Sequence, residues 1–302
     1  LLSVQAHPPG NTEVYVIVDA DLGATIRLGF AVDVDAATLT AKLAGGRRDQ
    51  QRVLELLGPD SADELQALLK GWLARRAAKP TELKSGLVER LSDATSWAEV
   101  DARLKSLHEM YWTMLDSMNA IAVKAGDVVY NANPPRVVAA TGKPASAEVH
   151  ALGNPEGRGV LALEIRRPGP TLRAWDNVRF PLRKLDIEDA LDAVNLTATR
   201  PEDFIVERRR VRPGVTRSVD CEYFRLEHLE PTASVAVDVP ASPPHCLHAL
   251  GGCVSVWRGQ VEIAALERGE SAFAPARLGA YRIVAEREPA TVVRVSLPPY
   301  VD

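Results

Sequence analysis

The sequence predicts a mainly β protein that is interrupted by one large helical insertion. Two observations lead to this fold class: the spacing of apolar residues changes twice along the chain, and turn signals recur at short intervals after residue 122. Alternating apolar and polar residues are typical of half-buried strands, whereas apolar residues three and four positions apart are typical of helices. The length of 302 residues allows one large domain or two smaller ones.

Residues 1–34 read as strands and residues 35–118 read as helices. The segment EVYVIVDA at 13–20 is rich in β-branched residues, and TIRLGF at 25–30 continues this pattern. The segments QQRVLELL, ADELQALLKGWLARR and WAEVDARLKSLHEMYWTML then place apolar residues at helical spacing. Ser61 with Glu64 matches a capping box, which predicts the start of a helix there. We therefore expect 35–118 to be a helical insertion whose apolar stripes form a core.

Residues 119–302 read mostly as short strands. Turn sequences such as NPEG at 154–157, RPGV at 212–215 and ERGE at 267–270 are bounded by strand-like runs, a pattern typical of a sandwich or barrel. One helix, IEDALDAV, interrupts the strands from Ile187 onward, and a stretch near 200–215 rich in Arg, Pro and Glu reads as a linker. We expect one β domain from residues 1–34 and 119–205, and a second from 206–302.

Composition argues against several classes of protein. With 46% hydrophobic residues, 25% charged residues and a net charge of −4, the chain is ordinary for a globular protein, and no basic block indicates a nucleic-acid partner. No apolar run reaches the roughly 20 residues that cross a bilayer, so no membrane span is expected. The three cysteines include no CxxC pair, which favours a reducing compartment and a cytoplasmic location. Because LLSVQAH reads as the inside of a strand, we expect residues to be missing before Leu1 or between His7 and Glu13.

Gln5, His7 and Glu13 form a candidate metal-binding motif near the start of the chain. Residues two apart on a strand share a face, so Gln5 and His7 are expected to project together. An imidazole, a carboxylate and an amide oxygen are plausible ligands for Zn²⁺ or another borderline divalent cation, and His150 is a candidate for the fourth ligand. Taken alone, so short a motif also occurs by chance in proteins that bind no metal.

The chain resembles the type I mannose-6-phosphate isomerases, a family of the cupin superfamily, in five segments that follow one another in order. These are LLSVQAHPP with NTEVYVIVDA and IRLGF, then VKAGDVVYNANP, HALGNPEGRGVLALEI, TLRAWDNVRFPLRKLDIEDALDAV and ERGESAFAPARLGAYRI. The resemblance implies a bicupin, which is a pair of double-stranded β-helix (jelly-roll) domains. Residues 1–34 and 119–205 would form the metal-binding cupin, and 206–302 the C-terminal one.

The resemblance also implies a zinc-dependent reaction. One Zn²⁺ per chain would be held by Gln5, His7, Glu13 and His150. The enzyme would interconvert mannose 6-phosphate and fructose 6-phosphate, or a related phosphosugar, through an enediol. This chemistry needs a metal to polarise oxygen, a base to move a proton between neighbouring carbons, and a cation for the phosphate or enediolate.

Four further residues receive roles by the same resemblance. Glu164 is a candidate acid/base residue, and Arg173 matches an arginine beside the substrate, where a guanidinium suits phosphate and enediolate oxygens. Arg183 and Lys184 are candidates for phosphate binding, although they fit a solvated basic surface before a helix equally well. The expected partner is a small phosphosugar, and the expected assembly is a monomer or a homodimer.

The sequence departs from the family pattern at several places. Asn11 stands where the family usually has Lys, and Gly169 stands where it tends to have Asp. The segment NPPRVVAATGKPASAEVHA carries an insertion before His150, and the stretch between His7 and Glu13 is shorter than usual. These departures leave a second hypothesis: a diverged metal-binding bicupin with other chemistry, or with a sugar- or metabolite-binding role without turnover.

Other histidines are expected to be structural. His245 and His248 lie near Cys246 and Cys253 and suggest a second metal site, but HCLHAL alternates like a half-buried strand, which favours core or edge histidines. His228, in LEHLEP, is expected at the surface.

Overall fold

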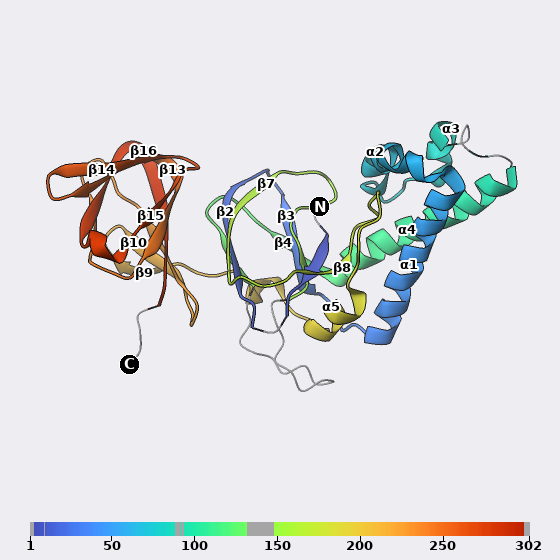
Figure 1. Ribbon diagram of the computed structural model, residues 1–302, viewed down its shortest axis with the longest axis horizontal. Coiled ribbons are helices and arrows are strands. Elements are labelled where there is room, and N and C mark those ends of the chain that lie inside the picture. The colour runs from blue at the N-terminus through green and yellow to red at the C-terminus, as the bar shows by residue number, and fades with distance from the viewer. Residues whose placement is uncertain (1–2, 9, 88–90, 92–93, 132–147, 299–302) are drawn as a thin grey trace. The chain divides into compact units, whose positions relative to one another are not determined.

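The computed structural model describes residues 3–8, 10–87, 91, 94–131 and 148–298, and the chain forms two compact units (Figure 1). Unit 1 is Leu1–Ile205 and unit 2 is Val206–Asp302. Unit 1 contains two sheets and the α-helices of the described residues, whereas unit 2 consists of strands and short turns. The predicted fold class, mainly β with a helical insertion, is confirmed.

Two antiparallel sheets make up the β part of unit 1. The five-stranded sheet has the order β4-β3-β6-β1-β8, and the three-stranded sheet has the order β5-β2-β7. The strands are β1 (Val4–Ala6), β2 (Glu13–Ala20), β3 (Thr25–Phe30), β4 (Met118–Ala122), β5 (Val128–Asn131), β6 (His150–Ala151), β7 (Val160–Arg166) and β8 (Leu172–Trp175). Tyr15 and Ile17 from one sheet share a buried cluster with Ile26, Leu28 and Ile121 from the other. The two sheets therefore pack face to face over a common core.

The helical insertion joins the β part of unit 1 between two neighbouring strands. Its helices are α1 (Ala36–Leu57), α2 (Ala62–Leu73), α3 (Lys84–Leu87) and α4 (Ala94–Ser117), and α1 and α4 lie side by side (Figure 1). They connect β3 to β4, which pair directly, with Phe30 opposite Met118. Trp72, Tyr111 and Trp112 are buried, as the predicted core stripes require. A segment of this size can be accommodated here because the paired strands hold its two ends together.

The helix ends differ in part from the prediction. Asp35 caps α1, because its carboxylate accepts a hydrogen bond of 2.8 Å from the Thr38 amide. Ser61 precedes α2 as predicted, but its hydroxyl donates to the Gly58 carbonyl and makes no capping bond to the helix. The predicted capping box is therefore wrong, because Ser61 ends the short turn Pro59–Ser61 with a helical backbone (φ −83°, ψ −2°) and lacks the extended conformation of a capping residue. None of the helices among the described residues is long and apolar enough to span a membrane.

The five-stranded sheet separates the helical core from the site described below. Val4 and Ala6 of β1 are fully buried in the same cluster as the leucines of the helices. Gln5 and His7 therefore project from the other side of the strand, as the alternation predicted. A further helix, α5 (Ile187–Ala193), follows β8 and packs on it, and its buried Ala190 and Leu191 belong to the core shared with the helices.

Unit 2 is one continuous antiparallel sheet that is bent by irregularities in two long strands. Its order is β14-β13-β16-β11-β10-β9, with β12 paired to β16 and β15 paired to β13. The strands are β9 (Arg209–Arg212), β10 (Val215–Asp220), β11 (Arg225–Leu229), β12 (Val237–Val239), β13 (His245–Arg258), β14 (Val261–Glu267), β15 (Ser271–Ala274) and β16 (Tyr281–Ser296). At the bend, Gly252 has a φ of +69°, and a Cβ there would lie 2.2 Å from the Arg287 carbonyl oxygen. Glycine is therefore required at this close approach of β13 and β16.

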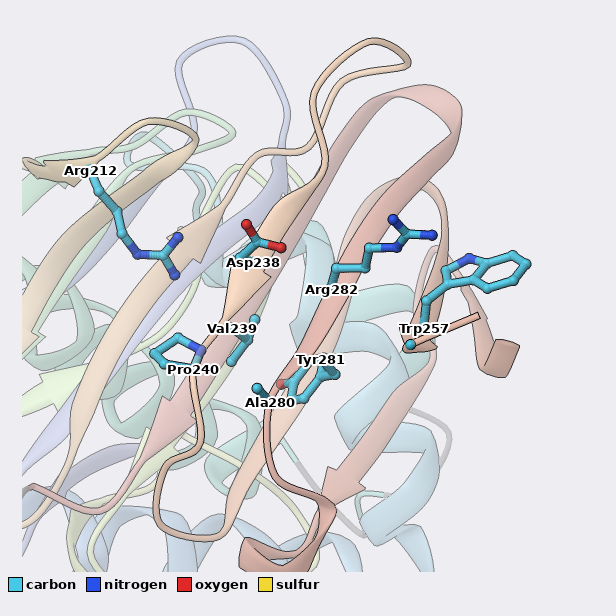
Figure 2. A pocket seen from close by; sticks show the side chains of 9 residues that line it. Arg212, Asp238, Val239, Pro240, Trp257, Ala280, Tyr281 and Arg282 are labelled. Atoms are coloured by element: carbon cyan, nitrogen blue, oxygen red, sulfur yellow. The ribbon is translucent and has the colours of Figure 1, made fainter. Parts of the chain in front are cut away.

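The outer face of unit 2 carries a cavity of about 560 Å³ (Figure 2). Asp238, Arg282 and Trp257 line it from adjacent strands, since Arg282 pairs in register with both of the others. Arg212 reaches the cavity from β9. None of the residues that line the cavity is a histidine, so its chemistry differs from that of the candidate metal centre in unit 1.

The histidines of unit 2 make structural contacts. His245 lies within 2.5 Å of the Tyr281 hydroxyl, and His248 lies within 2.7 Å of the Ser271 hydroxyl. His228 is fully buried, so the surface position predicted from the sequence is wrong. The reason is that β11 is an inner strand, paired to β10 on one side and to β16 on the other. Burial, together with the positive charge of Arg208, lowers the pKa of His228 to about 3.

We expect the buried His228 to make unit 2 less stable in mild acid. The pKa of His228 is lower in the folded state than the ordinary 6.5, so the unfolded chain binds a proton that the folded chain does not. Stability should therefore fall as the pH drops below about 6.5, at a rate of at most about 1.4 kcal/mol per pH unit. His228→Gln should flatten this slope between about pH 6.5 and 4.5, above the range in which carboxylates titrate. Hydrogen exchange of the β11 segment measures the effect, and an equal slope in the variant and the parent would contradict it.

Candidate metal centre

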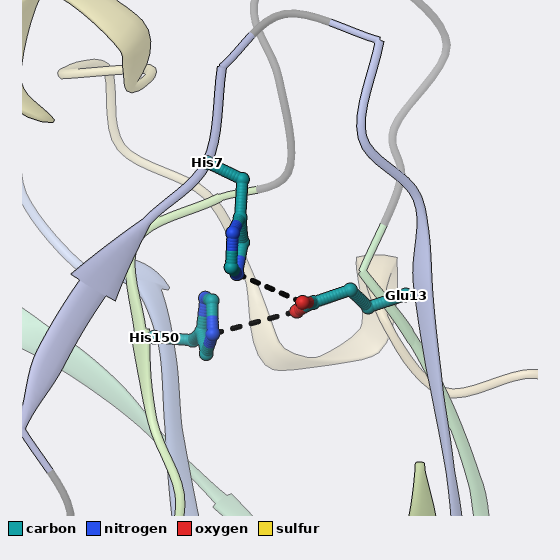
Figure 3. A group of neighbouring side chains, drawn as sticks. All are labelled: His7, Glu13 and His150. Carbon is teal, nitrogen blue, oxygen red and sulfur yellow. Dashed lines mark ion pairs between the residues drawn. The ribbon is translucent and has the colours of Figure 1, made fainter. Parts of the chain in front are cut away.

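His7, Glu13 and His150 converge from three strands of unit 1 (Figure 3). His150 begins β6, Glu13 begins β2 in the facing sheet, and His7 follows the last residue of β1. Their exposed fractions are 0%, 1% and 5% for His7, Glu13 and His150 respectively. We call these three residues the trio. Within the part of the chain that the structure describes, it is the one group of three such side chains whose ligand atoms lie within 4.8 Å of one another.

Each carboxylate oxygen of Glu13 faces one imidazole. His7 Nε2 lies 2.8 Å from Glu13 Oε1, and His150 Nε2 lies 3.4 Å from Glu13 Oε2. The two rings are stacked, with their centroids 5.1 Å apart. Two ring nitrogens and a carboxylate thus point at one small volume, which is the donor set that zinc takes in proteins.

Backbone carbonyls fix the orientation of both imidazoles. His7 Nδ1 lies 3.0 Å from the Pro170 carbonyl oxygen, and His150 Nδ1 lies 3.0 Å from that of Glu148. A carbonyl oxygen can only accept, so Nδ1 of His7 carries a proton and donates it. His150 Nδ1 lies between the Glu148 carbonyl oxygen and the Asn131 amide nitrogen, which is 3.2 Å away, and both contacts hold its ring in place. The Nε2 atoms are thereby left to face Glu13. Metal-binding histidines are oriented in the same manner, because a partner on one ring nitrogen directs the lone pair of the other toward the metal.

Burial and mutual contact set the charges of the trio. Burial alone would raise the pKa of Glu13, but hydrogen bonds from His7 and Tyr15 and the charge of His150 lower it to about 2. Burial likewise opposes the charged form of His7, yet the hydrogen bond to Glu13 leaves its pKa raised. For His150, burial prevails and lowers the pKa. The Tyr15 hydroxyl donates to Glu13 Oε2 at 2.6 Å. The trio therefore holds a carboxylate that needs a positive partner, which a divalent cation would supply.

Gln5 lies in the same row as His150. It pairs in register with His150 on one side and with Arg173 on the other. Residues directly opposite each other on antiparallel strands share a face, so the row His150–Gln5–Arg173 crosses the sheet beside the trio. This placement is compatible with the amide oxygen of Gln5 as a further ligand.

Glu164 and Arg166 lie two residues apart on β7, and both are placed beside the trio. Glu164 pairs in register with Tyr15, and Arg166 pairs with Glu13. Arg166 Nη1 lies 3.5 Å from Glu13 Oε1, and its Nε lies 3.8 Å from Glu164 Oε1. The sequence reasoning missed Arg166. The alternation that places Glu164 on the inner face also places residue 166 there, so the signal was present.

The predicted cations are held by carboxylates outside the trio. Arg173 Nε lies 3.4 Å from Ser3 Oγ and 4.0 Å from Asp176 Oδ1. Arg183 forms an ion pair with Asp176, which is buried. Lys184 Nζ lies 2.8 Å from Asp186 Oδ1, and its side chain is 86% exposed.

The two departures from the family pattern lie next to each other. A Cβ on Gly169 would sit 3.5 Å from Asn11 Oδ1. Both polar atoms of the Asn11 amide are buried without a hydrogen-bond partner among the described residues. They adjoin a cavity of about 170 Å³, which is lined by Pro8, Gly10, Asn11, Arg167, Pro168, Gly169 and Pro170. The insertion predicted before His150 falls largely on residues 132–147, which lie outside the described residues.

Comparisons with known proteins find structural relatives only. No family model matches the chain, and no curated protein matches it. Among solved structures, the mannose 6-phosphate isomerase from Bacillus subtilis superposes with a TM-score of 0.57 and 16% identity, over 97% of this chain and 71% of that one. A putative mannosephosphate isomerase from Archaeoglobus fulgidus gives 0.53 and 15%, over 98% and 68%. A mannose 6-phosphate isomerase bound with zinc and yttrium gives 0.57 and 13%, over 98% and 76%.

The chain has the fold of the mannose-6-phosphate isomerases. The bicupin architecture with a helical part, expected from the sequence, is thereby confirmed. At identities of 13–16%, the likeness establishes the fold alone. The metal-binding chemistry of the candidate site is inferred from the side chains of the trio.

Charges placed at positions 11 and 169 should be coupled, because the two positions are in contact. We expect Asn11→Lys alone to destabilise by about 1–3 kcal/mol, since it places an ammonium in a buried position without a partner. Adding Gly169→Asp should recover part of this loss, with a coupling energy of about 1 kcal/mol or more in a double-mutant cycle followed by urea unfolding.

The matched control pairs Asn11→Lys with Gly71→Asp, because a Cβ on Gly71 has no atom within 4 Å. That cycle should show additive effects. Equal coupling in both cycles would contradict the contact between residues 11 and 169.

Proposed function

We propose that the protein is a zinc-dependent aldose–ketose isomerase that acts on a phosphorylated hexose, such as the mannose 6-phosphate and fructose 6-phosphate pair. The trio is the observation that carries this proposal: two oriented imidazoles and one carboxylate, buried together on the fold of the mannose-6-phosphate isomerases. Gln5, beside His150 in the sheet, completes the proposed ligand set for one Zn²⁺ per chain.

A bound zinc ion would polarise the oxygens on the two reacting carbons of the sugar. His7, Glu13 and His150 are suited to hold such an ion, because their ligand atoms already point inward and the rest of each side chain is buried. The hydrogen bonds to Pro170, Glu148 and Tyr15 fix these side chains before any ion arrives.

Glu164 is the proposed acid/base residue. Its side chain is 41% exposed, so a substrate can reach it, and burial together with the charge of Glu13 raises its pKa. A raised pKa suits a group that must both take and return a proton. The carboxylate takes a proton from the carbon beside the carbonyl, and the electron pair of that C–H bond forms the double bond of the enediolate. The same proton then returns to the former carbonyl carbon, while the hydroxyl proton passes from its oxygen to the former carbonyl oxygen, so that the carbonyl and the hydroxyl exchange places.

Arg173 is proposed to bind the substrate, with Arg183 and Lys184 as weaker candidates for the phosphate. Arg173 shares a row with Gln5, which supports a place at the edge of the site. Arg183 and Lys184 would have to exchange their present carboxylate partners for a phosphate. A small phosphosugar as partner, a cytoplasmic location and a monomer or homodimer complete the proposal.

A second candidate function rests on the neutral residues at positions 11 and 169, which line the small cavity near His7 together with Arg167. Asn11 and Gly169 remove a cation and an anion from the place where the family pattern has them. Such a change favours a diverged protein that keeps the metal but performs another reaction, or binds a sugar or metabolite without turnover.

His150→Ala should abolish stoichiometric zinc binding, because it removes one of the two oriented nitrogens of the trio. Elemental analysis after dialysis against zinc measures the bound metal. His248→Ala is the matched control, since His248 is bonded to Ser271 in unit 2 and should retain the metal. Retention of zinc by His150→Ala, or its absence from the parent protein, would show that the trio is not the metal site.

The reaction is tested by assaying conversion of mannose 6-phosphate to fructose 6-phosphate by zinc-loaded protein. Glu164→Gln should keep the metal and lower kcat by about 10²- to 10⁴-fold, the usual contribution of a general acid/base. Arg173→Ala should also keep the metal but mainly raise KM. Stoichiometric zinc without turnover in the parent would reject the isomerase and leave the second candidate. An unchanged rate and KM in Arg173→Ala would reject the role given to that arginine.

A further inference from the structure

Arg166 is the cation that faces the trio. Within the described ranges, it is the cation that forms an ion pair with the carboxylate of the trio, with Nη1 at 3.5 Å from Glu13 Oε1. Its side chain is 34% exposed, so the residue that contacts the buried Glu13 is itself partly accessible to solvent. It lies on β7 two residues from Glu164, on the same face of the strand.

The guanidinium is held in place but keeps donors for a ligand. Arg166 Nη1 donates to Thr171 Oγ1 and Nη2 donates to the Gly169 carbonyl, both at 3.3 Å. An arginine side chain has five N–H donors in a fixed planar fork. The separations from Glu13 and Glu164, 3.5 and 3.8 Å, are longer than a normal hydrogen bond. Donors aimed between the two carboxylates are therefore available to an oxygen that enters there.

The surrounding charges give this position a specific role. Asn11 is neutral, and Arg173 and Arg183 are directed at Asp176. Glu13 and Glu164 both contribute negative charge near the point where the proposed reaction builds up an enediolate. Without a cation there, a developing oxyanion would be repelled by the ionised Glu13, since Glu164 becomes neutral when it takes the proton. Arg166 provides that cation from a strand opposite the one that carries Glu13.

We propose that Arg166 binds the vicinal oxygens of an α-hydroxycarbonyl substrate and its enediolate beside the metal. This inference rests on the proposed isomerase function and adds the residue that stabilises its anionic intermediate. Negative charge moves onto the carbonyl oxygen as Glu164 takes the proton, and a planar guanidinium meets two neighbouring oxygens with two parallel hydrogen bonds. The ligand class is therefore planar molecules with two adjacent oxygens, one of them anionic.

The test uses glycolohydroxamate, a small planar mimic of an enediolate, titrated calorimetrically into zinc-loaded protein. Arg166→Gln should weaken its binding by about 10- to 100-fold, the loss expected for charge-assisted hydrogen bonds. Arg166→Lys should show an intermediate loss, because an ammonium keeps the charge but not the fork. Arg158→Gln removes an equal charge at the other end of β7, where the side chain donates to the Leu22 carbonyl, and should leave binding unchanged.

Zinc affinity, measured by competition with a chelator, separates a ligand-binding role from a structural one. Arg166→Gln should bind zinc at least as tightly as the parent, because it removes a positive charge beside the ligand Glu13. A loss of zinc affinity of tenfold or more would show that Arg166 only holds Glu13 in place, and would overturn the inference. Unchanged hydroxamate affinity in zinc-loaded Arg166→Gln would overturn it as well. Failure of the parent to bind zinc would instead reject the proposed function, on which the inference rests.

Discussion

The buried carboxylate of Glu13 is the feature on which the rest of unit 1 depends. Moving a carboxylate out of water costs several kcal/mol unless charges and hydrogen bonds replace the lost solvation. At 1% exposure, Glu13 receives that replacement from His7, His150 and Tyr15. His7 and His150 in turn require the carbonyls of Pro170 and Glu148 as acceptors. One buried charge thus determines the positions of side chains on both sheets and of the loop after β7.

The same constraint explains why a large helical insertion can be tolerated so close to the site. β1 has two different faces: Val4 and Ala6 belong to the core shared with the helices, whereas Gln5 faces the trio. The helices are attached at the paired ends of β3 and β4, and Asn119 beside that junction donates to the carbonyls of Phe30 and Thr199. The helical part therefore packs against the face of β1 opposite the one that carries Gln5.

Local periodicity was enough to predict the fold class, the helical insertion and the shared face of Gln5 and His7, because each depends on residues close together in sequence. The features that it missed depend on pairing between distant strands. Arg166 meets Glu13 only because β7 pairs with β2, and His228 is buried only because β11 is paired on both sides. A strand sequence shows which residues share a face, but not which residues of another strand lie opposite them. Ser61 shows a different limit, since the turn Pro59–Ser61 that precedes α2 gives it a helical backbone, which the capping pattern in the sequence does not reveal.

The contact between residues 11 and 169 changes how the departures from the family pattern are understood. Read along the sequence, a missing lysine and a missing aspartate are two separate losses. In the structure they are one, because Asn11 Oδ1 lies 3.5 Å from the place of a Cβ on Gly169, and a charge at either position without the other would be poorly compensated. Arg166 binds the same loop through the Gly169 carbonyl while its guanidinium faces Glu13. The loop after β7 thus lines the small cavity beside Asn11 and also accepts a hydrogen bond from Arg166. Arg166 thereby lies within 4.0 Å of two carboxylates, Glu13 and Glu164, beside the buried trio, and joins the loop that carries Gly169 to the residues that surround the candidate metal centre.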